Sequence, residues 1–207
     1  MRNLPLVRPF TRWLLAPLGW ACLALAMGLN AITQQRRLSP AESALAKQVF
    51  PGLAVENVRM GLPGRLLRFI HRCNGGRPFV CMHVIYPGAT PMSQRTFVHE
   101  MTHVWQSTWM GHAYMTQALA AQWRAAWQSW WQTGCFDDSA AYALDDAALC
   151  QQAGHWHAFN PEQQAEIVAS YAEYLMDGPD RTREPLSSTI ALDRLMPFMA
   201  RLRGEGG

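Results

Sequence analysis

Charged residues are scarce in this chain, whereas a disordered segment would need many more of them. Asp, Glu, Lys and Arg make up 16% of its 207 residues, and hydrophobic residues make up 49%. Because a chain of this composition has enough apolar surface to bury, we expect a folded core. The length suits one domain with a short appendage, and we find no internal repeat or second domain in the sequence.

A concentrated basic patch and a nucleic-acid-binding motif are also missing. The formal net charge is only +3, and the basic residues are scattered. Arg65, Arg68, Arg72 and Arg77 form the densest group, which we interpret as a solvated face around two strands. We therefore expect no nucleic-acid partner.

Charge is absent altogether from one run near the N-terminus. Residues 13–32 follow three arginines, contain no charged residue and are long enough to cross a bilayer as a helix. Residues 1–35 are therefore predicted to be a signal anchor in the inner membrane, with residues 13–32 in the bilayer and the rest of the chain periplasmic. A cleaved signal peptide, giving a periplasmic or secreted protein, and a buried amphipathic helix are the alternatives. Four residues weaken the apolar run: Pro17, Gly19, Gly28 and Asn30.

No Cys-x-x-Cys spacing occurs, which argues against a cysteine-rich zinc site. Cys73 and Cys81 bracket a predicted turn, and Cys135 and Cys150 bracket a predicted loop. In an oxidising compartment these spacings suit two local disulfides, although four cysteines allow three pairings. Four buried free thiols are the alternative.

What is present predicts an α+β unit that is mostly helical. Ser39-Pro40-Ala41-Glu42 has the pattern of a capping box and opens a helix that ends near Phe50. Two strand-like runs, Leu66 to His71 and Phe79 to Tyr86, flank a Gly-rich turn and predict a small antiparallel hairpin. Further helices are predicted from Thr90-Pro91 to Gly111, from Met115 to Thr133, from Asn160-Pro161 to Met176, and from Ser188 to Arg203 with a kink at Pro197.

Tryptophan is unusually frequent in the middle of the chain. Six of the nine tryptophans fall between Trp105 and Trp131. Their helical spacing is typical of core packing, and the wall of a substrate groove is the alternative.

One of the predicted helices contains the pattern His-Glu-x-x-His, at residues 99–103. Residues four apart stand on one face of a helix, so His99 and His103 can bind one zinc ion while Glu100 acts as the general base for its water. Apolar neighbours on both sides would make a buried ionisable cluster unfavourable without a metal or partners. Two surface histidines and a solvated glutamate are the alternative.

A catalytic zinc also needs a third protein ligand and one open position. Glu162 and Glu166 lie four residues apart at the start of a predicted helix, so one can bind the metal while the other accepts a hydrogen bond from a ligand imidazole. Alternatively, both glutamates only stabilise the first turns of that helix, through the favourable interaction of negative charge with the helix dipole. Four further residues are candidates for stabilising negative charge on a substrate: His155, His157, Tyr171 and Tyr174. Either of the two histidines could instead be the third metal ligand.

The order of these residues resembles that of the gluzincin peptidases, in which a glutamate on a second helix is the third zinc ligand. This resemblance implies that Glu162 binds the metal and that Glu166 supports a ligand histidine. The metzincin pattern is absent, since Gln106 and Trp109 stand where it needs Gly and His.

Three blocks of the chain, residues 38–46, 97–106 and 162–168, look like the Vgr-related metallopeptidases of bacteria. The resemblance covers about residues 38–175 and implies a zincin-like metallopeptidase domain over 36–207, with His99, His103 and Glu162 holding zinc and Glu100 catalytic. It also implies a setting in the bacterial envelope or a secretion system. The expected partners are then a peptide, protein or cell-wall peptide substrate and secretion-system components.

Two functions of other classes fit the same residues. The chain could be a non-catalytic, zinc-containing adaptor of a secretion assembly, which a fourth protein ligand would favour and an intact Glu100 argues against. It could also be a peptidase toxin whose apolar N-terminus inserts into a target membrane.

Overall fold

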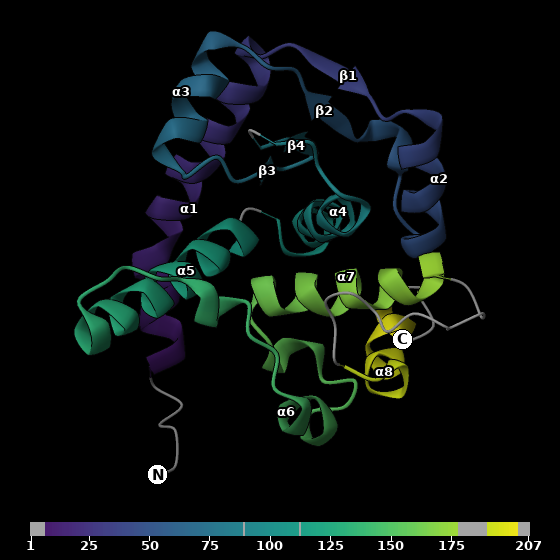
Figure 1. Ribbon diagram of the computed structural model, residues 1–207. Helices are drawn as coiled ribbons and strands as arrows, with labels where there is room; N and C mark the ends of the chain where they lie inside the picture. Colours follow the sequence, from purple (N-terminus) through teal and green to yellow (C-terminus); the bar gives the residue numbers. More distant parts are fainter. Residues whose placement is uncertain (1–6, 89, 112, 178–189, 203–207) are drawn as a thin grey trace.

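A computed structural model of the chain describes residues 7–88, 90–111, 113–177 and 190–202 (Figure 1). The fold is α+β and mostly helical, which confirms the predicted class. The elements, with η for 3-10 helices, are α1 (Val7–Ile32), β1 (Gln35–Arg37), α2 (Pro40–Val49), η1 (Val55–Asn57), β2 (Arg59–Gly61), α3 (Arg65–Cys73), β3 (Phe79–Cys81), β4 (Val84–Tyr86), α4 (Gln94–Met110), α5 (Ala113–Thr133), η2 (Ser139–Ala141), α6 (Asp146–Gln151), η3 (Trp156–Ala158), α7 (Pro161–Asp177) and α8 (Leu192–Leu202).

Four short strands form one mixed sheet in the order β1-β2-β4-β3. The strands β2 and β4 are parallel, with Met60 opposite Ile85, whereas the outer two pairs are antiparallel. Parallel neighbours need a crossover connection, because the chain must return to the same end of the sheet. Here α3 and β3 supply that crossover, which places α3 beside the sheet (Figure 1).

The predicted strand at Leu66 to His71 is wrong, because this segment is the helix α3. The antiparallel hairpin joins β3 to β4 instead, with Met82 in the left-handed region at φ 60° in its turn. A short apolar run does not distinguish a strand from a helix by itself, and the parallel pairing of β2 with β4 decides in favour of the helix. The strands β1 and β2 are three residues long each and were not predicted, because such short strands have no recognisable pattern.

The helices α4 and α7 pack against each other at the centre of the molecule (Figure 1). Every residue of α4 from Phe97 to Gln106 is buried, because the sheet, α2, α5 and α7 all contact this helix. The helix begins after Ser93, whose side-chain oxygen accepts a hydrogen bond from the backbone of Thr96, so it starts later than Pro91. The His-Glu-x-x-His segment is therefore in the core.

The helix α1 does not fit the predicted inner-membrane anchor. Among the residues that the structure describes, no helix combines the length and the apolar character needed to cross a membrane. That anchor is therefore wrong, and the physical reason is the series of Pro, Gly and Asn residues that interrupts the apolar run. A secreted or periplasmic location, and a boundary at residue 35, stay predictions.

The C-terminal end of α1 is tied to the sheet by side-chain hydrogen bonds. Asn30 donates to the backbone carbonyl of Cys81 over 3.1 Å and accepts from the Tyr86 hydroxyl over 2.7 Å. The hydroxyls of Tyr86 and Thr33 are 2.8 Å apart. Asn30 and Thr33, at the end of the apolar run, therefore attach α1 to the sheet.

The five cysteines are all free, so neither predicted disulfide is present. Cys73 is exposed at the end of α3, whereas Cys81 is buried in β3. Because α3 is a helix and not the partner strand of β3, these two residues do not face each other across a hairpin. Cys135 and Cys150 are both exposed.

The last predicted helix corresponds to α8, which contains Pro197 as expected. The predicted ends of that helix, residues 188, 189 and 203, lie outside the described residues. The helices predicted from the sequence are confirmed, with shifts of a few residues at those ends that the structure describes.

A substitution at Gly61 would test how closely the backbone of β2 approaches the ring of Tyr86 in β4. A Cβ atom at Gly61 would lie 2.3 Å and 2.6 Å from two ring carbons of Tyr86, whose ring is fully buried and whose hydroxyl is held. We expect Gly61→Ala to lower the free energy of unfolding by roughly 2 kcal/mol, since an overpacked core has little room to relax. Urea unfolding would measure this.

The control is Gly52→Ala, where an added Cβ meets nothing within 4 Å. That variant should change the free energy of unfolding by no more than about 0.5 kcal/mol. Equal stability of the two variants would contradict the close approach of β2 to Tyr86.

Candidate metal centre

The N-terminus of α7 carries Glu162 to the middle of α4. Asn160 caps α7, since its side-chain oxygen accepts hydrogen bonds from the backbone N–H groups of Glu162 and Gln163 over 2.9 Å and 3.0 Å. The side chain of Gln163 accepts from the backbone of Asn160 in return, over 3.1 Å. This capping box fixes Glu162 in the first turn of α7, which packs against α4.

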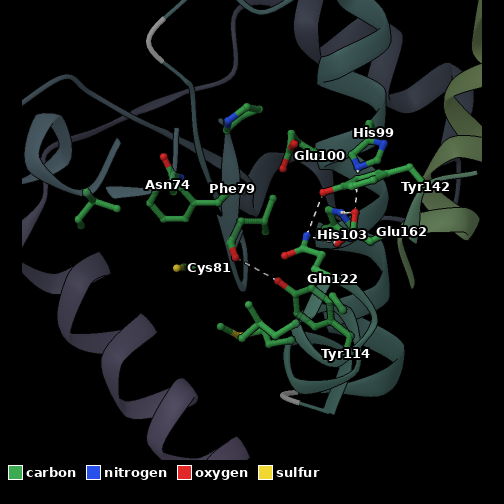
Figure 2. Close-up of a pocket in the computed structure, with 16 residues that line it drawn as sticks. Asn74, Phe79, Cys81, His99, Glu100, His103, Tyr114, Gln122, Tyr142 and Glu162 are labelled. Atoms are coloured by element: carbon green, nitrogen blue, oxygen red, sulfur yellow. Dashed lines mark hydrogen bonds and ion pairs between the residues drawn. The ribbon is translucent and has the colours of Figure 1, made fainter. Parts of the chain in front are cut away.

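Glu162 meets both histidines of the motif at one point (Figure 2). Its Oε2 atom lies 3.3 Å from Nε2 of His99 and 3.3 Å from Nε2 of His103. The three side chains are buried, and their nearest ligand atoms lie within 4.8 Å of one another. A buried group of this kind could bind a metal ion.

The other ring nitrogen of His99 is held by Glu166. Nδ1 of His99 lies 2.9 Å from Oε1 of Glu166, and an ionised carboxylate can only accept, so Nδ1 carries the hydrogen. Arg95 forms an ion pair with Glu166 and contacts Glu173 over 3.3 Å, which keeps the Glu166 carboxylate ionised and oriented. In the neutral ring, Nε2 of His99 therefore presents its lone pair towards Glu162.

The other ring nitrogen of His103 is held by two buried glutamines. The amide nitrogen of Gln164 donates to two backbone carbonyls just before α7, so its oxygen faces Gln106 and accepts from it over 2.9 Å. The same nitrogen of Gln106 donates to the carbonyl of Pro161 over 2.9 Å. The oxygen of Gln106 is then the atom 2.8 Å from Nδ1 of His103, and it accepts a hydrogen bond from that ring.

Both imidazoles are thus arranged to offer Nε2 as a ligand atom. The donor set of two imidazole nitrogens and one carboxylate oxygen is one that zinc prefers. The hydrogen bonds to Nδ1 fix the tautomer and the ring orientation that such a ligand needs. The residues present therefore fit a zinc ion.

Without a metal, the buried Glu162 carboxylate is neutralised by protons on the histidines. Burial lowers the pKa of His99, but hydrogen bonds to Glu162 and Glu166 outweigh it and raise this pKa to about 10. The pKa of His103 is raised in the same way by Glu162. Burial raises the pKa values of Glu162 and Glu166, but the histidines lower both more strongly. His99 and Arg95 together lower the pKa of Glu166 to about 2. The buried carboxylates therefore need a positive charge beside them, which either the protonated histidines or a metal ion can supply.

Glu100 lies beside this group and points into a cavity of about 310 Å³ (Figure 2). Burial raises the pKa of Glu100 above its usual range, and the two histidines oppose that rise. One wall of the cavity is apolar and comes from α3, β3 and α5, with Ile70, Phe79, Val80, Met115, Ala118 and Leu119. The cavity gives a ligand access to the histidines and to Glu100 together.

Two residues of the centre, Gln122 and Tyr142, were missed in the sequence. The amide nitrogen of Gln122 donates to Oε1 of Glu162 over 2.8 Å and to the Tyr142 hydroxyl over 3.0 Å. Figure 2 shows the Tyr142 hydroxyl pointing to the space between the ligand side chains. Burial raises the pKa of Tyr142, so it stays a hydrogen-bond donor at neutral pH. No motif marks either residue, and only a polar position in the Trp-rich helix hinted at Gln122.

The structure does not bring the other four candidates into this cavity. His155 and His157 are exposed on the segment of η3. Tyr171 is buried in the main core, and the hydroxyl of Tyr174 donates to the carbonyl of Ile190. None of the four lines the cavity beside the histidines.

Comparisons of the chain with protein-family models, with curated proteins and with solved structures found no match. The resemblance to the Vgr-related metallopeptidases therefore stays a prediction from the sequence. The geometry of the centre is what supports a function.

Metal binding by point variants tests the ligand set. We expect the wild-type chain to bind about one zinc ion, and Glu162→Ala to lose it, because a direct ligand is removed. Glu166→Ala should weaken zinc binding by about 10- to 100-fold, the usual effect of losing a partner of a ligand histidine. Zinc content after dialysis and competition with a chelator would measure both.

Glu173→Ala is the control, since Glu173 is on the same helix and pairs with Arg95, whereas the carboxylates that pair with the histidines are those of Glu162 and Glu166. It should retain zinc. A stronger loss in Glu166→Ala than in Glu162→Ala would exchange the two roles.

Zinc binding should also release protons. Because the pKa of His99 is raised to about 10 in the metal-free chain, its ring is protonated at neutral pH and must lose that proton to bind a metal. Zinc affinity should then rise with pH, by about tenfold per pH unit for each proton released. Calorimetric titrations in buffers of different ionisation enthalpy would measure the release, and no release would show that both rings are neutral beforehand.

Proposed function

We propose that the chain is a zinc-dependent peptidase with a zincin-like active site. In this proposal His99, His103 and Glu162 hold the metal, and Glu100 is the general base. The observation that carries it is the convergence of two oriented imidazoles and one carboxylate beside a buried Glu100 at a cavity. The likeness to the gluzincins and to the Vgr-related metallopeptidases supports the same assignment.

A catalytic centre is favoured over a structural one by the number of ligands. Structural zinc sites use four protein ligands, whereas catalytic sites use three and leave one position open. Within the described residues, the only candidate metal-binding group consists of His99, His103 and Glu162. The cavity adjoins this group, and a structural site has no use for Glu100. The adaptor function is therefore disfavoured.

The chemistry would divide between the metal and the side chains around it. A zinc ion held here would polarise a substrate carbonyl and lower the pKa of a water towards about 7. Glu100 would accept a proton from the attacking water and return it to the leaving amine. Burial raises the pKa of Glu100, which suits a group that must both take and give a proton near neutral pH.

Negative charge that develops on the substrate needs a donor near the ligands. The Tyr142 hydroxyl points to that space (Figure 2), and Gln122 holds it. We assign the stabilising role to Tyr142, in place of the histidines and tyrosines considered from the sequence. Gln122 would also keep the Glu162 carboxylate oriented, since it donates to the oxygen that faces away from the histidines.

The substrate in this proposal is a peptide. The apolar wall of the cavity can accommodate an apolar side chain next to the scissile bond, and the polar centre faces the carbonyl. Proteins and the peptide stems of the cell wall are both substrates of this class. A role in the bacterial envelope or in a secretion system rests on the sequence resemblance alone.

Glu100→Gln separates chemistry from metal binding. We expect this variant to keep its zinc and to lose hydrolysis by about 100- to 10,000-fold, the usual contribution of a general base. Cleavage of a library of fluorogenic peptides and of cell-wall fragments, with zinc content measured on the same samples, would show this.

Two further variants complete that experiment. Glu56→Gln changes an exposed residue that does not line the cavity and should keep full activity. Tyr142→Phe should keep zinc and lower kcat more than it changes KM, because it removes a donor to the transition state. Full activity of Glu100→Gln would refute the assignment of the base.

A further inference from the structure

Three helices of the structure, α1, α3 and α5, contain no acidic residue. All fifteen Asp and Glu residues of the chain lie elsewhere. The charged residues in these helices whose side chains the structure describes are four exposed arginines: Arg65, Arg68, Arg72 and Arg124. A charge bias of this kind over three helices favours a negatively charged partner.

The three helices lie on the same side of the molecule (Figure 1). A small core cluster joins them, since Ala26 of α1 and Leu67 of α3 pack with buried residues of β3 and β4, and Met115 of α5 packs against the same cluster. The helices α1 and α5 also contact each other directly. We call their outer surface, with the adjoining Phe136, the α1–α3–α5 face.

This face exposes an unusual number of large apolar side chains. Trp123 and Trp131 of α5 are each 68% exposed, and Phe136 just after α5 is 63% exposed. Further exposed apolar residues of the three helices are Trp20, Leu25, Met27 and Ile32 of α1, Leu66 and Phe69 of α3, and Trp127 and Trp130 of α5. Exposed apolar surface on this scale marks an interaction site.

The aromatic residues at the end of α5 form a connected group. The ring centroids of Trp130 lie 5.3 Å from Trp127, 5.2 Å from Trp131 and 5.8 Å from Phe136. Tryptophan combines a large apolar ring with one polar N–H group, and for that reason it prefers the boundary between lipid headgroups and acyl chains.

We propose that the α1–α3–α5 face binds the surface of a bilayer that contains anionic phospholipids, without crossing it. The tryptophans would enter the headgroup boundary while the arginines contact lipid phosphates. Helices that are apolar on one side and basic, but too polar to cross a membrane, bind in this way. This docking does not depend on peptidase activity.

The charges favour a bilayer over a second copy of the chain. Two copies joined through these helices would bring arginines against arginines, with no acidic residue in the three helices to pair with them. Asp138, which lies beside Trp123 and Phe136, already forms an ion pair with Arg77. Like charges brought together oppose association. An anionic lipid surface supplies the missing negative charge.

The face also reaches the opening of the metal centre. Trp123 and Phe136 line a cavity of about 510 Å³ together with Asn74, Gln122 and the ion pair of Arg77 with Asp138. Asn74 and Gln122 also line the cavity that contains the histidines and Glu100. A bilayer bound to the face would lie next to the entrance of the candidate active site.

Vesicle binding by the full chain tests the proposal. We expect binding to vesicles of phosphatidylcholine mixed with phosphatidylglycerol, and binding about tenfold weaker or more to phosphatidylcholine alone, because the arginines lose their partners. Trp123→Gln and Trp131→Gln should each weaken binding by about tenfold. Arg68→Gln with Arg72→Gln should weaken binding to the mixed vesicles only.

The matched control is Trp109→Gln. Trp109 is 68% exposed, as Trp123 and Trp131 are, but its ring adjoins Trp105 of the main core cluster. This variant should bind the mixed vesicles like the wild type. Circular dichroism of each variant would verify that it folds.

Three outcomes would overturn the proposal. They are no binding to either vesicle, equal losses in Trp109→Gln and Trp131→Gln, and a wild-type dimer in sedimentation that Trp131→Gln dissociates. Glu100→Gln should bind vesicles like the wild type even if no peptide is ever cleaved. The docking and the peptidase activity can therefore fail separately.

Discussion

The structure depends on one buried carboxylate, that of Glu162. An ionised carboxylate in the core is unfavourable by several kcal/mol unless a positive charge and hydrogen bonds compensate it. His99 and His103 supply the charge, either as protons or by holding a metal, and Gln122 supplies a hydrogen bond. The histidines must direct Nε2 towards Glu162 to do this. Glu166 and Gln106 hold them in that orientation through hydrogen bonds to Nδ1.

The fold meets this requirement by placing α4 in the centre. A helix surrounded by the sheet, α2, α5 and α7 can carry its histidines away from solvent, which a surface helix cannot do. The capping box at Asn160 and Gln163 then sets where α7 begins, and with it the position of Glu162. The crossover between the parallel strands β2 and β4 contains α3, and Ile70 of this helix forms part of the cavity wall.

The local signals of the sequence were sufficient for part of the centre. The spacing of His99 and His103 and the capping pattern before Glu162 are properties of single helices, and the structure places these residues together. Gln122 and Tyr142 reach the centre by contacts between distant segments, which no spacing encodes. The strand expected at Leu66 to His71 is a helix for a similar reason, because the parallel pairing of β2 with β4 is not visible locally.

The chain of buried amides from Gln164 through Gln106 to His103 has a consequence for how the sequence can change. Backbone carbonyls fix the Gln164 end of this hydrogen-bonded row, so each amide has only one orientation that satisfies its neighbours. A substitution at either glutamine leaves a donor or acceptor of the other unsatisfied in the core. The two positions, which are 58 residues apart, are therefore expected to be inherited as a pair, and homologues that lose one should have lost the other.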